Sequence, residues 1–232
     1  MEGPQAVREA LDTLLELYVL DPSDPLALEA SRRGVEVVEV DAKVLSALAE
    51  TVSPQGLVGV APLLDTDLGT ALSTAPRLVT VLHEVADPGN AGTVIRTSDA
   101  AGADAVVLTA GSVDPHNGKC VRASAGSLWH LPVVSGAAVS DLLHELRRTG
   151  LQVLATAATG EDDLDGLVDD GSLAAPTAWM FGAEAHGLPR DVLAAADRRV
   201  RIPLRGRAES LNLATAAAVC LYASARAQRV LE

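Results

Sequence analysis

Polar side chains follow several apolar segments of this chain, at positions where they could hold a ligand. They are Asn90 and Arg96 in DPGNAGTVIRTS, Lys119 and Arg122 in NGKCVRASAG, Glu184 in FGAEAHGLP, and Ser210 and Asn212 in RAESLNLA. In α/β proteins, ligands lie beyond the carboxyl ends of parallel strands. A guanidinium or ammonium group suits an anionic ligand, and glycines on either side of Glu184 let a ligand approach the backbone. We therefore expect a ligand site built from Asn90, Arg96, Glu184, Ser210 and Asn212.

Each of these residues also has a simpler interpretation. Asn90 and Ser210 could cap the helices that follow them. Glu184 could interact with the positive end of a helix, and His186 could be an ordinary loop histidine. Arg96 is harder to explain in this way, because we expect it to face inward, where arginine needs a partner anion.

Two groups of cations could bind phosphates. Lys119 and Arg122 are three residues apart and share one helix face, where they could bind phosphate or form surface salt bridges. The second group is Arg198, Arg199, Arg201, Arg205 and Arg207. These arginines could bind an anionic partner or cover a solvated strand edge and loop.

Alternating strand-like and helix-like segments must position these residues. Over the first 60 residues, we predict helices at about 7–15, 25–33 and 42–50 and strands at 18–20, 35–40 and 53–61. Beyond residue 76, the predicted strands are 77–85, 103–111, 130–136, 151–158, 177–184 and 198–204. The predicted helices are 91–102, 116–128, 139–149, 189–196 and 210–230, with a loop and short helix in the acidic segment 160–171. Near-continuous apolar strands between helices predict a parallel sheet covered on both faces.

Composition excludes several classes of protein. Hydrophobic residues make up 48% of the 232 residues and aromatics only 2%, so the core must consist of Ala, Val and Leu. No apolar stretch reaches membrane-spanning length, and the N-terminus does not resemble a signal peptide. Cys120 and Cys220 lack metal-binding spacing and predict reduced thiols in a cytoplasmic protein. The net charge of −13 is unlike that of a nonspecific nucleic-acid binder, so RNA contacts would need a local basic patch.

The familiar nucleotide-binding fingerprints are missing. Neither GxxxxGK[ST] nor GxGxxG after a strand occurs, no Cys/His cluster suggests zinc, and no nucleophile elbow is evident. From the residues alone, the chain is an α/β enzyme with an unassigned ligand site.

Taken together, the polar stretches resemble the SpoU branch of the SPOUT methyltransferases. NAGTVIRTSDAAGAD, FGAEAHGLP and IPLRGRAESLNLATAAAVCLYA are similar to the three motifs of that family, in the same order, and KCVRASAGSLWHLPV matches a further stretch usual in it. The matches cover residues 77–230. The first 60 residues, with EGPQAVREAL and SPQGLVGVA, resemble the small ribosomal-protein-like substrate-binding domain often attached to this family.

The resemblance implies an RNA ribose 2′-O-methyltransferase that uses S-adenosylmethionine, with rRNA favoured over tRNA. It implies a trefoil knot near the C-terminus and a homodimer whose active sites use both subunits. We expect a small α/β domain over 1–62, a linker over 63–76 and an α/β-knot SPOUT domain over 77–232. Donor contacts are assigned to Thr156, Ala157, Gly182, Glu184, Gly187, Ile202, Leu204, Ser210 and Leu211, and RNA contacts to Lys119, Arg122, Arg205 and Arg207.

The implied catalytic residues are Asn90, Arg96, Glu184, Ser210 and Asn212. Arg96 is the family's activator of the ribose hydroxyl, but a guanidinium retains its proton in proteins. We assign Arg96 the binding of the 3′ phosphate and the orientation of the hydroxyl. The N-terminal segment 1–76 carries a net charge of −9, which is unusual for a domain that binds RNA. Two other classes stay open: an RNA-binding or assembly protein that retains the donor pocket without turnover, and a small-molecule enzyme on an ordinary doubly wound fold.

Overall fold

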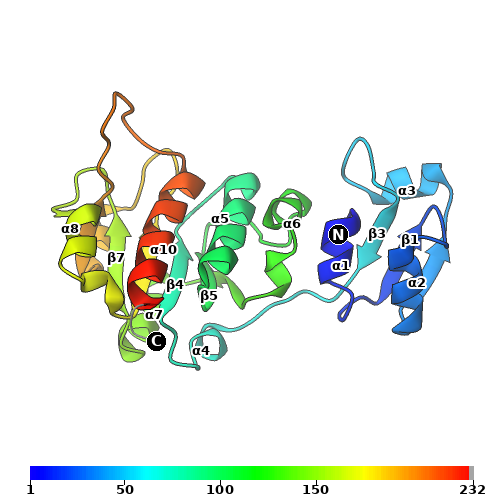
Figure 1. The fold of residues 1–232 in the computed structure, drawn as a ribbon, viewed down its shortest axis with the longest axis horizontal. Coiled ribbons are helices and arrows are strands. Elements are labelled where there is room, and N and C mark those ends of the chain that lie inside the picture. The colour runs from blue at the N-terminus through cyan, green and yellow to red at the C-terminus, as the bar shows by residue number, and fades with distance from the viewer. Residues whose placement is uncertain (230–232) are drawn as a thin grey trace.

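The computed structural model describes residues 1–229 of the chain. A three-stranded sheet occupies the first 60 residues and a seven-stranded sheet the rest. Figure 1 shows the two sheets in separate units, joined by an extended segment that is drawn in cyan. The chain is therefore an α/β protein with a small unit ahead of a larger one.

The small unit alternates helices and strands. Its elements are α1 (Pro4–Glu9), β1 (Glu16–Val19), α2 (Pro25–Arg32), β2 (Glu36–Glu39), α3 (Ala42–Leu48) and β3 (Leu57–Val60). β1 is the central strand, parallel to β2 and antiparallel to β3. Leu17 and Val19 of β1 are fully buried and pack against Val7 and Ala27 in one apolar cluster. The alternating side chains of β1 thus give the small unit a core of its own.

The large unit is a parallel α/β sheet with its own element order. Its elements are α4 (Leu68–Ala71), β4 (Leu78–Leu82), α5 (Pro88–Ala101), β5 (Ala105–Thr109), α6 (Gly118–Ser124), the 3-10 turn η1 (Ser127–Trp129), β6 (Val133–Ala137), α7 (Val139–Arg148), β7 (Gln152–Thr156), β8 (Asp162–Asp163), α8 (Leu164–Asp169), the 3-10 turn η2 (Ser172–Ala174), β9 (Thr177–Phe181), α9 (Arg190–Ala195), β10 (Arg198–Arg201) and α10 (Leu213–Arg229). The strand order is β6-β5-β4-β9-β7-β10-β8, and every pair is parallel. Parallel pairing of buried apolar strands confirms the predicted fold class.

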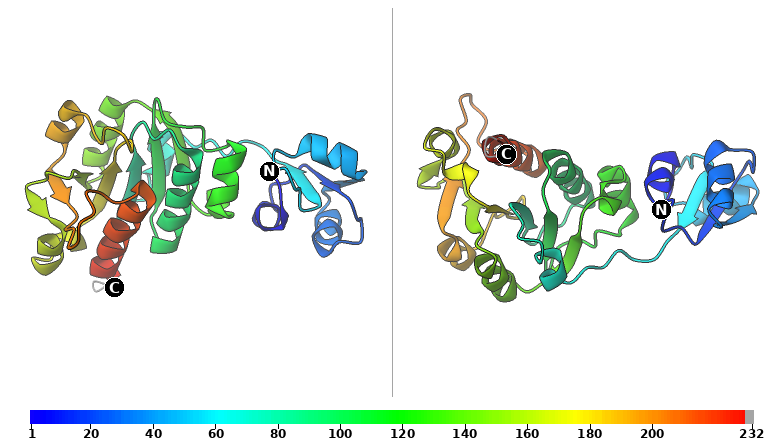
Figure 2. Two further views of the ribbon diagram at one scale, coloured as in Figure 1. Left: turned by 90° about the horizontal axis from the view of Figure 1, so that it is seen from above. Right: turned by 60° about the horizontal axis from the view of Figure 1, so that its bottom comes forward.

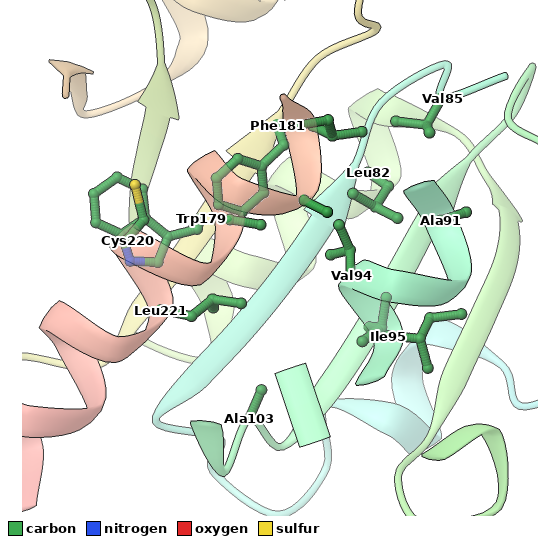
Figure 3. Packing of buried hydrophobic residues seen from close by; sticks show 14 of the residues in the cluster. Leu82, Val85, Ala91, Val94, Ile95, Ala103, Trp179, Phe181, Cys220 and Leu221 are labelled. Atoms are coloured by element: carbon green, nitrogen blue, oxygen red, sulfur yellow. The ribbon is translucent and has the colours of Figure 1, made fainter. Parts of the chain in front are cut away.

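Helices cover both faces of the large sheet, as Figure 2 shows. One face packs against α5, α6, α8 and α10, and the other against α4, α7 and α9. On the first face, Trp179 and Phe181 of β9 are fully buried with ring centroids 6.3 Å apart (Figure 3). The Trp179 indole N–H donates to Ser224 Oγ of α10 at 2.9 Å, which satisfies a donor that burial would otherwise leave unpaired.

The structure differs from the predicted elements in several places. The first helix spans Pro4–Glu9 and not 7–15, and the strand β8 lies in the acidic segment predicted as a loop and short helix. The helix predicted over 116–128 is broken at Ala125 and Gly126, whose φ angles of 49° and 99° are left-handed and end α6. The helix predicted over 210–230 begins only at Leu213, and its predicted last residue lies outside the described residues. The segment 63–76 contains the short helix α4, which begins at the Asp67 cap.

Candidate active site

Three neighbouring strands of the large sheet end at one cluster of loops. β9, β7 and β10 are adjacent and parallel, so their carboxyl ends lie at the same edge. The loops that follow these strands line two cavities of about 560 Å³ and 630 Å³. Both cavities are lined by Thr156, Ala157, Ala158, Ser210, Leu211 and Ala216. Because they share these walls, we treat them as two lobes of one site, of a size typical for small-molecule ligands.

The residues assigned to donor contacts all line these lobes. Ile202 and Leu204 line the first lobe, while Gly182, Glu184 and Gly187 line the second. Thr156, Ala157, Ser210 and Leu211 line both. The Thr156 hydroxyl donates to the Met180 carbonyl at 3.0 Å and the Ala157 N–H to the Val200 carbonyl at 2.9 Å. These bonds fix the loop after β7 between the loops of its two neighbours.

Asn90, Glu184 and Asn212 are joined by hydrogen bonds beside the second lobe. Asn90 Nδ2 donates to Glu184 Oε1 at 2.7 Å, and Asn212 Nδ2 donates to Asn90 Oδ1 at 3.0 Å. Asn212 Oδ1 accepts from the N–H groups of Ala214 and Thr215 at the start of α10. Each amide therefore has its orientation set by a partner at either end. The structure brings together three residues that lie in three separate motifs.

Asn90 does not cap α5, contrary to one of the interpretations of its sequence position. The cap is Asp87, whose Oδ1 accepts from the Asn90 N–H at 2.8 Å, followed by Pro88 in the first turn. Asp87 Oδ2 accepts from Lys119 Nζ at 2.8 Å. Lys119 and the Asn90 N–H lower the pKa of the Asp87 carboxyl, because both favour its charged form. Because Asp87 caps α5, the Asn90 side chain does not bond the helix backbone and can form its hydrogen bond with Glu184.

The glycines around Glu184 allow two stretches of backbone to lie in close contact. A Cβ added at Gly182 would overlap the carbonyl of Gly187. Gly187 itself has a φ of 65°, and its N–H donates to the Ala183 carbonyl at 2.8 Å. Because only glycine fits these positions without strain, the loop exposes backbone groups to the second lobe.

Arg96 does not lie where the sequence predicted it. Its side chain is exposed, not inward, and within residues 1–229 it forms neither a hydrogen bond nor an ion pair. Arg96 is six residues beyond Asn90, which turns it by about 120° around the α5 axis. Its neighbours on that exposed side of the helix are Thr93 and Ala100. A single copy of the chain therefore does not combine Arg96 with Asn90.

Ser210 does not lie at the start of α10, where a helix cap would be. It lines both lobes and is exposed, while Asn212 makes the capping bonds of α10. The capping interpretation of Ser210 is therefore wrong, because α10 begins three residues later than predicted. The Ser210 hydroxyl stays available to a ligand of the site.

Most of the candidate RNA-binding cations are paired with carboxylates. Arg199 bonds Glu161 at 2.8 Å, Arg201 bonds Asp163 at 3.1 Å, and Arg205 bonds Asp165 at 2.6 Å. Arg198 lies 3.7 Å from Asp162. Arg122 pairs with Glu2 and Glu50. Within the described part of the chain, Arg207 alone of the predicted RNA contacts has no such partner.

Sequence reasoning missed several residues that line the site, and it named Arg201 only as a member of the basic cluster. Asp163 and Arg201 line the first lobe, where the Arg201 guanidinium also donates to the Gly160 carbonyl at 2.9 Å. The acidic segment around Asp163 gave no signal, because only its pairing with β10 brings it to the site. Ala216 could have been found, since it lies one helical turn after Asn212.

Residues 1–229 contain neither a side-chain cluster suited to a metal ion nor a membrane-spanning helix. No group of three or more His, Cys, Asp or Glu side chains there is placed to hold a metal ion. None of the helices in that range combines the length and apolar character needed to cross a membrane.

Known proteins resemble the chain over both units. Residues 77–222 match the SpoU rRNA Methylase family, and residues 1–66 match the domain described as RNA 2′-O ribose methyltransferase substrate binding. The 23S rRNA (guanosine(2553)-2′-O)-methyltransferase RlmP of Bacillus subtilis (strain 168) is 37% identical over 226 residues, which are 96% of this chain and 86% of that protein.

Solved structures show the same similarity in three dimensions. An AdoMet-bound rRNA methyltransferase from Sinorhizobium meliloti is 34% identical, with a TM-score of 0.84 over 97% of this chain and 86% of that one. The SpoU methyltransferase AviRb from Streptomyces viridochromogenes, in complex with AdoMet, is 28% identical, with a TM-score of 0.86 over 99% and 89% of the two chains. The chain therefore belongs to the SpoU rRNA Methylase family and carries that family's substrate-binding domain at its N-terminal end.

Proposed function

We propose that this protein transfers a methyl group from S-adenosylmethionine to a ribose 2′-hydroxyl of rRNA. The observation that carries the proposal is the hydrogen-bonded group of Asn212, Asn90 and Glu184 beside the two-lobed cavity. Relatives named as 23S rRNA 2′-O-methyltransferases support rRNA over tRNA as the substrate. Cytoplasmic action follows from a ribosomal substrate.

The chain's own residues fit the donor. The lobes provide backbone groups at Gly182 and Gly187, an apolar wall at Ile202 and Leu204, and hydroxyls at Thr156 and Ser210. An adenosine with a short charged tail needs this combination of apolar surface and few polar contacts. S-adenosylmethionine, when bound, supplies an electrophilic methyl group on its sulfonium. The overlap that a Cβ at Gly182 would cause explains why this wall has no side chain there.

Asn90, Glu184 and Asn212 would hold the ribose in line with the donor. Glu184 Oε1 accepts from Asn90, which leaves its second oxygen for a ribose hydroxyl or for Arg96. Transfer needs the hydroxyl oxygen at near-attack distance and a path for its proton. Positioning by groups that are already oriented is worth several orders of magnitude in rate.

Arg96 would reach this site from a second copy of the chain, in a homodimer. Its exposed side of α5 lies beside α10, because the Tyr222 hydroxyl of α10 contacts the Ala100 carbonyl at 3.4 Å. Val219 and Tyr222 add exposed apolar surface on α10. Such a surface lies next to an arginine that has no ionic partner among residues 1–229, and it suits a twofold interface that brings each Arg96 to the partner's Asn90 and Glu184.

Mixing two inactive variants tests this arrangement. If Arg96 serves the partner's site, an Asn90→Ala chain combined with an Arg96→Ala chain forms heterodimers with one intact and one doubly altered site. An equal mixture after subunit exchange should then regain about a quarter of wild-type activity, because half of the dimers have one working site of two. No recovery would place Arg96 in the site of its own chain.

The fold around the cavity also suits a knotted chain and the proposed domain limits. β9 lies between β4 and β7 although it follows both in the sequence, an order in which the chain returns to the middle of its own sheet. We propose a trefoil knot in this region, a small substrate domain over 1–62, a linker over 63–76 and a methyltransferase domain over 77–232.

Incubation of the protein with ribosomal RNA, transfer RNA and tritiated donor tests the function. We expect label in rRNA, located by ribose mapping to a single 2′-O-methylated nucleotide. Label in tRNA alone would show that the substrate is tRNA and not rRNA. Donor binding without transfer to either RNA would instead identify an assembly protein that retains the donor pocket.

A further inference from the structure

The small unit is docked against the large one along α6 and η1. Figure 1 shows α1 facing α6 across the boundary between the two units. Apolar contact begins this interface, because Trp129 of η1 packs against the cores of both units and Ala6 of α1 joins the core of the large unit. The position of the small unit is therefore set by direct contact as well as by the segment 63–76.

Arg122 of α6 forms the charged centre of this interface. Its Nη1 bonds the Glu2 carboxylate and lies 3.5 Å from Glu50 Oε2. The Glu2 side chain is only 8% exposed, and its other oxygen accepts from the Thr51 hydroxyl at 3.0 Å. One oxygen of this buried carboxylate is bonded within the small unit, and the other is paired with a cation of the large unit.

His130 makes a second charged contact across the boundary. Its Nε2 lies 3.2 Å from Glu9 of α1, and its Nδ1 lies 2.7 Å from Asp99 of α5. Asp99 and Glu9 both raise the pKa of His130, against a smaller opposing effect of burial, because they favour its charged form. The imidazole therefore joins a carboxylate of each unit.

Two glycines of the large unit leave room for the glutamates of the small one. A Cβ added at Gly118 would overlap the Glu50 carboxylate, and one added at Gly126 would overlap Glu9. Gly118 has no left-handed backbone that would call for glycine, and the absence of a side chain there lets the Glu50 carboxylate lie directly against α6. The surface of α6 is shaped for these side chains.

We propose that Arg122 and His130 are positioning residues, which hold the small unit in a fixed orientation relative to the methyl-transfer site. The charge latch consists of Arg122 and His130 of the large unit and Glu2, Glu9 and Glu50 of the small unit. Its role in placing the RNA rests on the proposed function. By this assignment, Arg122 is not a ligand of RNA phosphate, although its sequence position suggested one.

Local charge supports this assignment over phosphate binding. Arg122 faces two carboxylates, Glu2 and Glu50, so the side chains around it carry a net negative charge. A phosphate would have to displace carboxylates that already satisfy the guanidinium, and it would be repelled by those that stay. Part of the negative charge of the small unit therefore forms ion pairs with the large unit at this boundary.

The two roles predict opposite effects of removing the glutamates. In a latch, Arg122→Ala, Glu2→Gln and Glu50→Gln all loosen the small unit, so all three should raise the KM for rRNA by on the order of five-fold. The kcat and the donor Kd should stay unchanged, and Arg122→Lys should restore part of the loss. If Arg122 bound phosphate, Glu50→Gln would release the cation and lower KM. That outcome would overturn the proposal.

Domain motion can be measured independently of activity. Both native cysteines are buried, and burial raises the pKa of Cys120 to about 12 and raises that of Cys220 as well, so both resist thiol labelling. Dyes on Ser31→Cys and Ser140→Cys, at exposed sites in the two units, would then report the distance between the units by single-molecule energy transfer.

We expect a narrow distribution of transfer efficiency for the parent chain and a broader one for Arg122→Ala and Glu2→Gln. The matched control is Arg33→Ala, which breaks pairs with Asp12 and Glu29 inside the small unit and should change nothing. An equally narrow distribution for Arg122→Ala would overturn the latch. Because this readout needs no methyl transfer, it stands even if the proposed function fails.

Discussion

Asn90 and Glu184 are 94 residues apart in the chain, yet their side chains meet at 2.7 Å. Asn90 comes from the first turn of α5, after β4, and Glu184 from the loop after β9. The two strands are neighbours in the sheet although β5, β6, β7 and β8 separate them in the sequence. The contact therefore depends on the placement of β9 beside β4, and it aligns a carboxylate with an amide at the edge of the two-lobed cavity.

Removing this contact should impair methyl transfer more than donor binding. In Asn90→Ala, Glu184 loses the group that orients it, and a displacement of about 1 Å at a reacting centre can cost on the order of 100-fold in rate. We expect a fall of that size in kcat, with a donor Kd changed less than about three-fold. Single-turnover transfer and calorimetry with the donor measure the two effects.

The control is Glu39→Gln, which replaces an exposed carboxylate of the small unit by a carboxamide. Equal losses in binding and turnover would show that Asn90 belongs to the donor pocket instead.

Gly182 offers a test of the donor cavity itself. Gly182→Ala would force a Cβ into the carbonyl of Gly187 and displace the loop that lines the second lobe. We expect a donor Kd that is weaker by roughly five-fold or more in calorimetry, since overpacking of this kind costs about 1–3 kcal/mol. The matched control is Gly206→Ala in the loop after β10, where a Cβ would meet nothing within 4 Å. If both variants bind the donor equally well, the second lobe does not hold it.

Local patterns in the sequence predicted the elements of the fold but not their side-chain partners. Apolar runs such as RLVTVL and LQVLAT predicted buried strands, because continuous apolar segments are what a two-sided parallel sheet requires. Capping of α5 by Asn90 was one of two interpretations left open, whereas Asp87 is the residue that accepts the N–H three residues on. Both residue types cap helices well, so composition could not distinguish them.

The carboxylate partners of the basic cluster come from distant parts of the sequence. Arg199, Arg201 and Arg205 meet carboxylates that precede them by about 40 residues in the sequence. These pairs exist because β8 adds to the sheet beside β10. A pattern of cations in one stretch gives no sign of such partners. For the same reason, the motif resemblance could group Arg96 with Asn90 although their side chains leave α5 on different sides.

The latch should respond to pH through His130. Its pKa in the folded protein is raised above 6.5 by Asp99 and Glu9. The stabilisation from the charged imidazole is therefore fully present below pH 6.5 and is lost as the pH rises through the raised value. We expect the distribution of energy transfer between the two units to broaden as the pH rises over that range. His130→Gln should remove this dependence, whereas His144→Gln, at an exposed site on α7, should leave it intact. A broadening that persists in His130→Gln would assign the effect to another group.

Arg207 should contribute more to RNA affinity than Arg205, although the two are only two residues apart. Arg205 is bonded to Asp165 at 2.6 Å, so a phosphate has to compete with that carboxylate, while Arg207 has no ionic partner among the residues that the structure describes. One phosphate contact contributes about 0.7–0.9 to the slope of log K against log salt. We expect Arg207→Ala to reduce the slope for rRNA fragments by about that amount, and Arg205→Ala to reduce it by clearly less. Filter binding from about 50 to 200 mM salt measures both. An unchanged slope for Arg207→Ala would mean that the loop after β10 does not bind RNA.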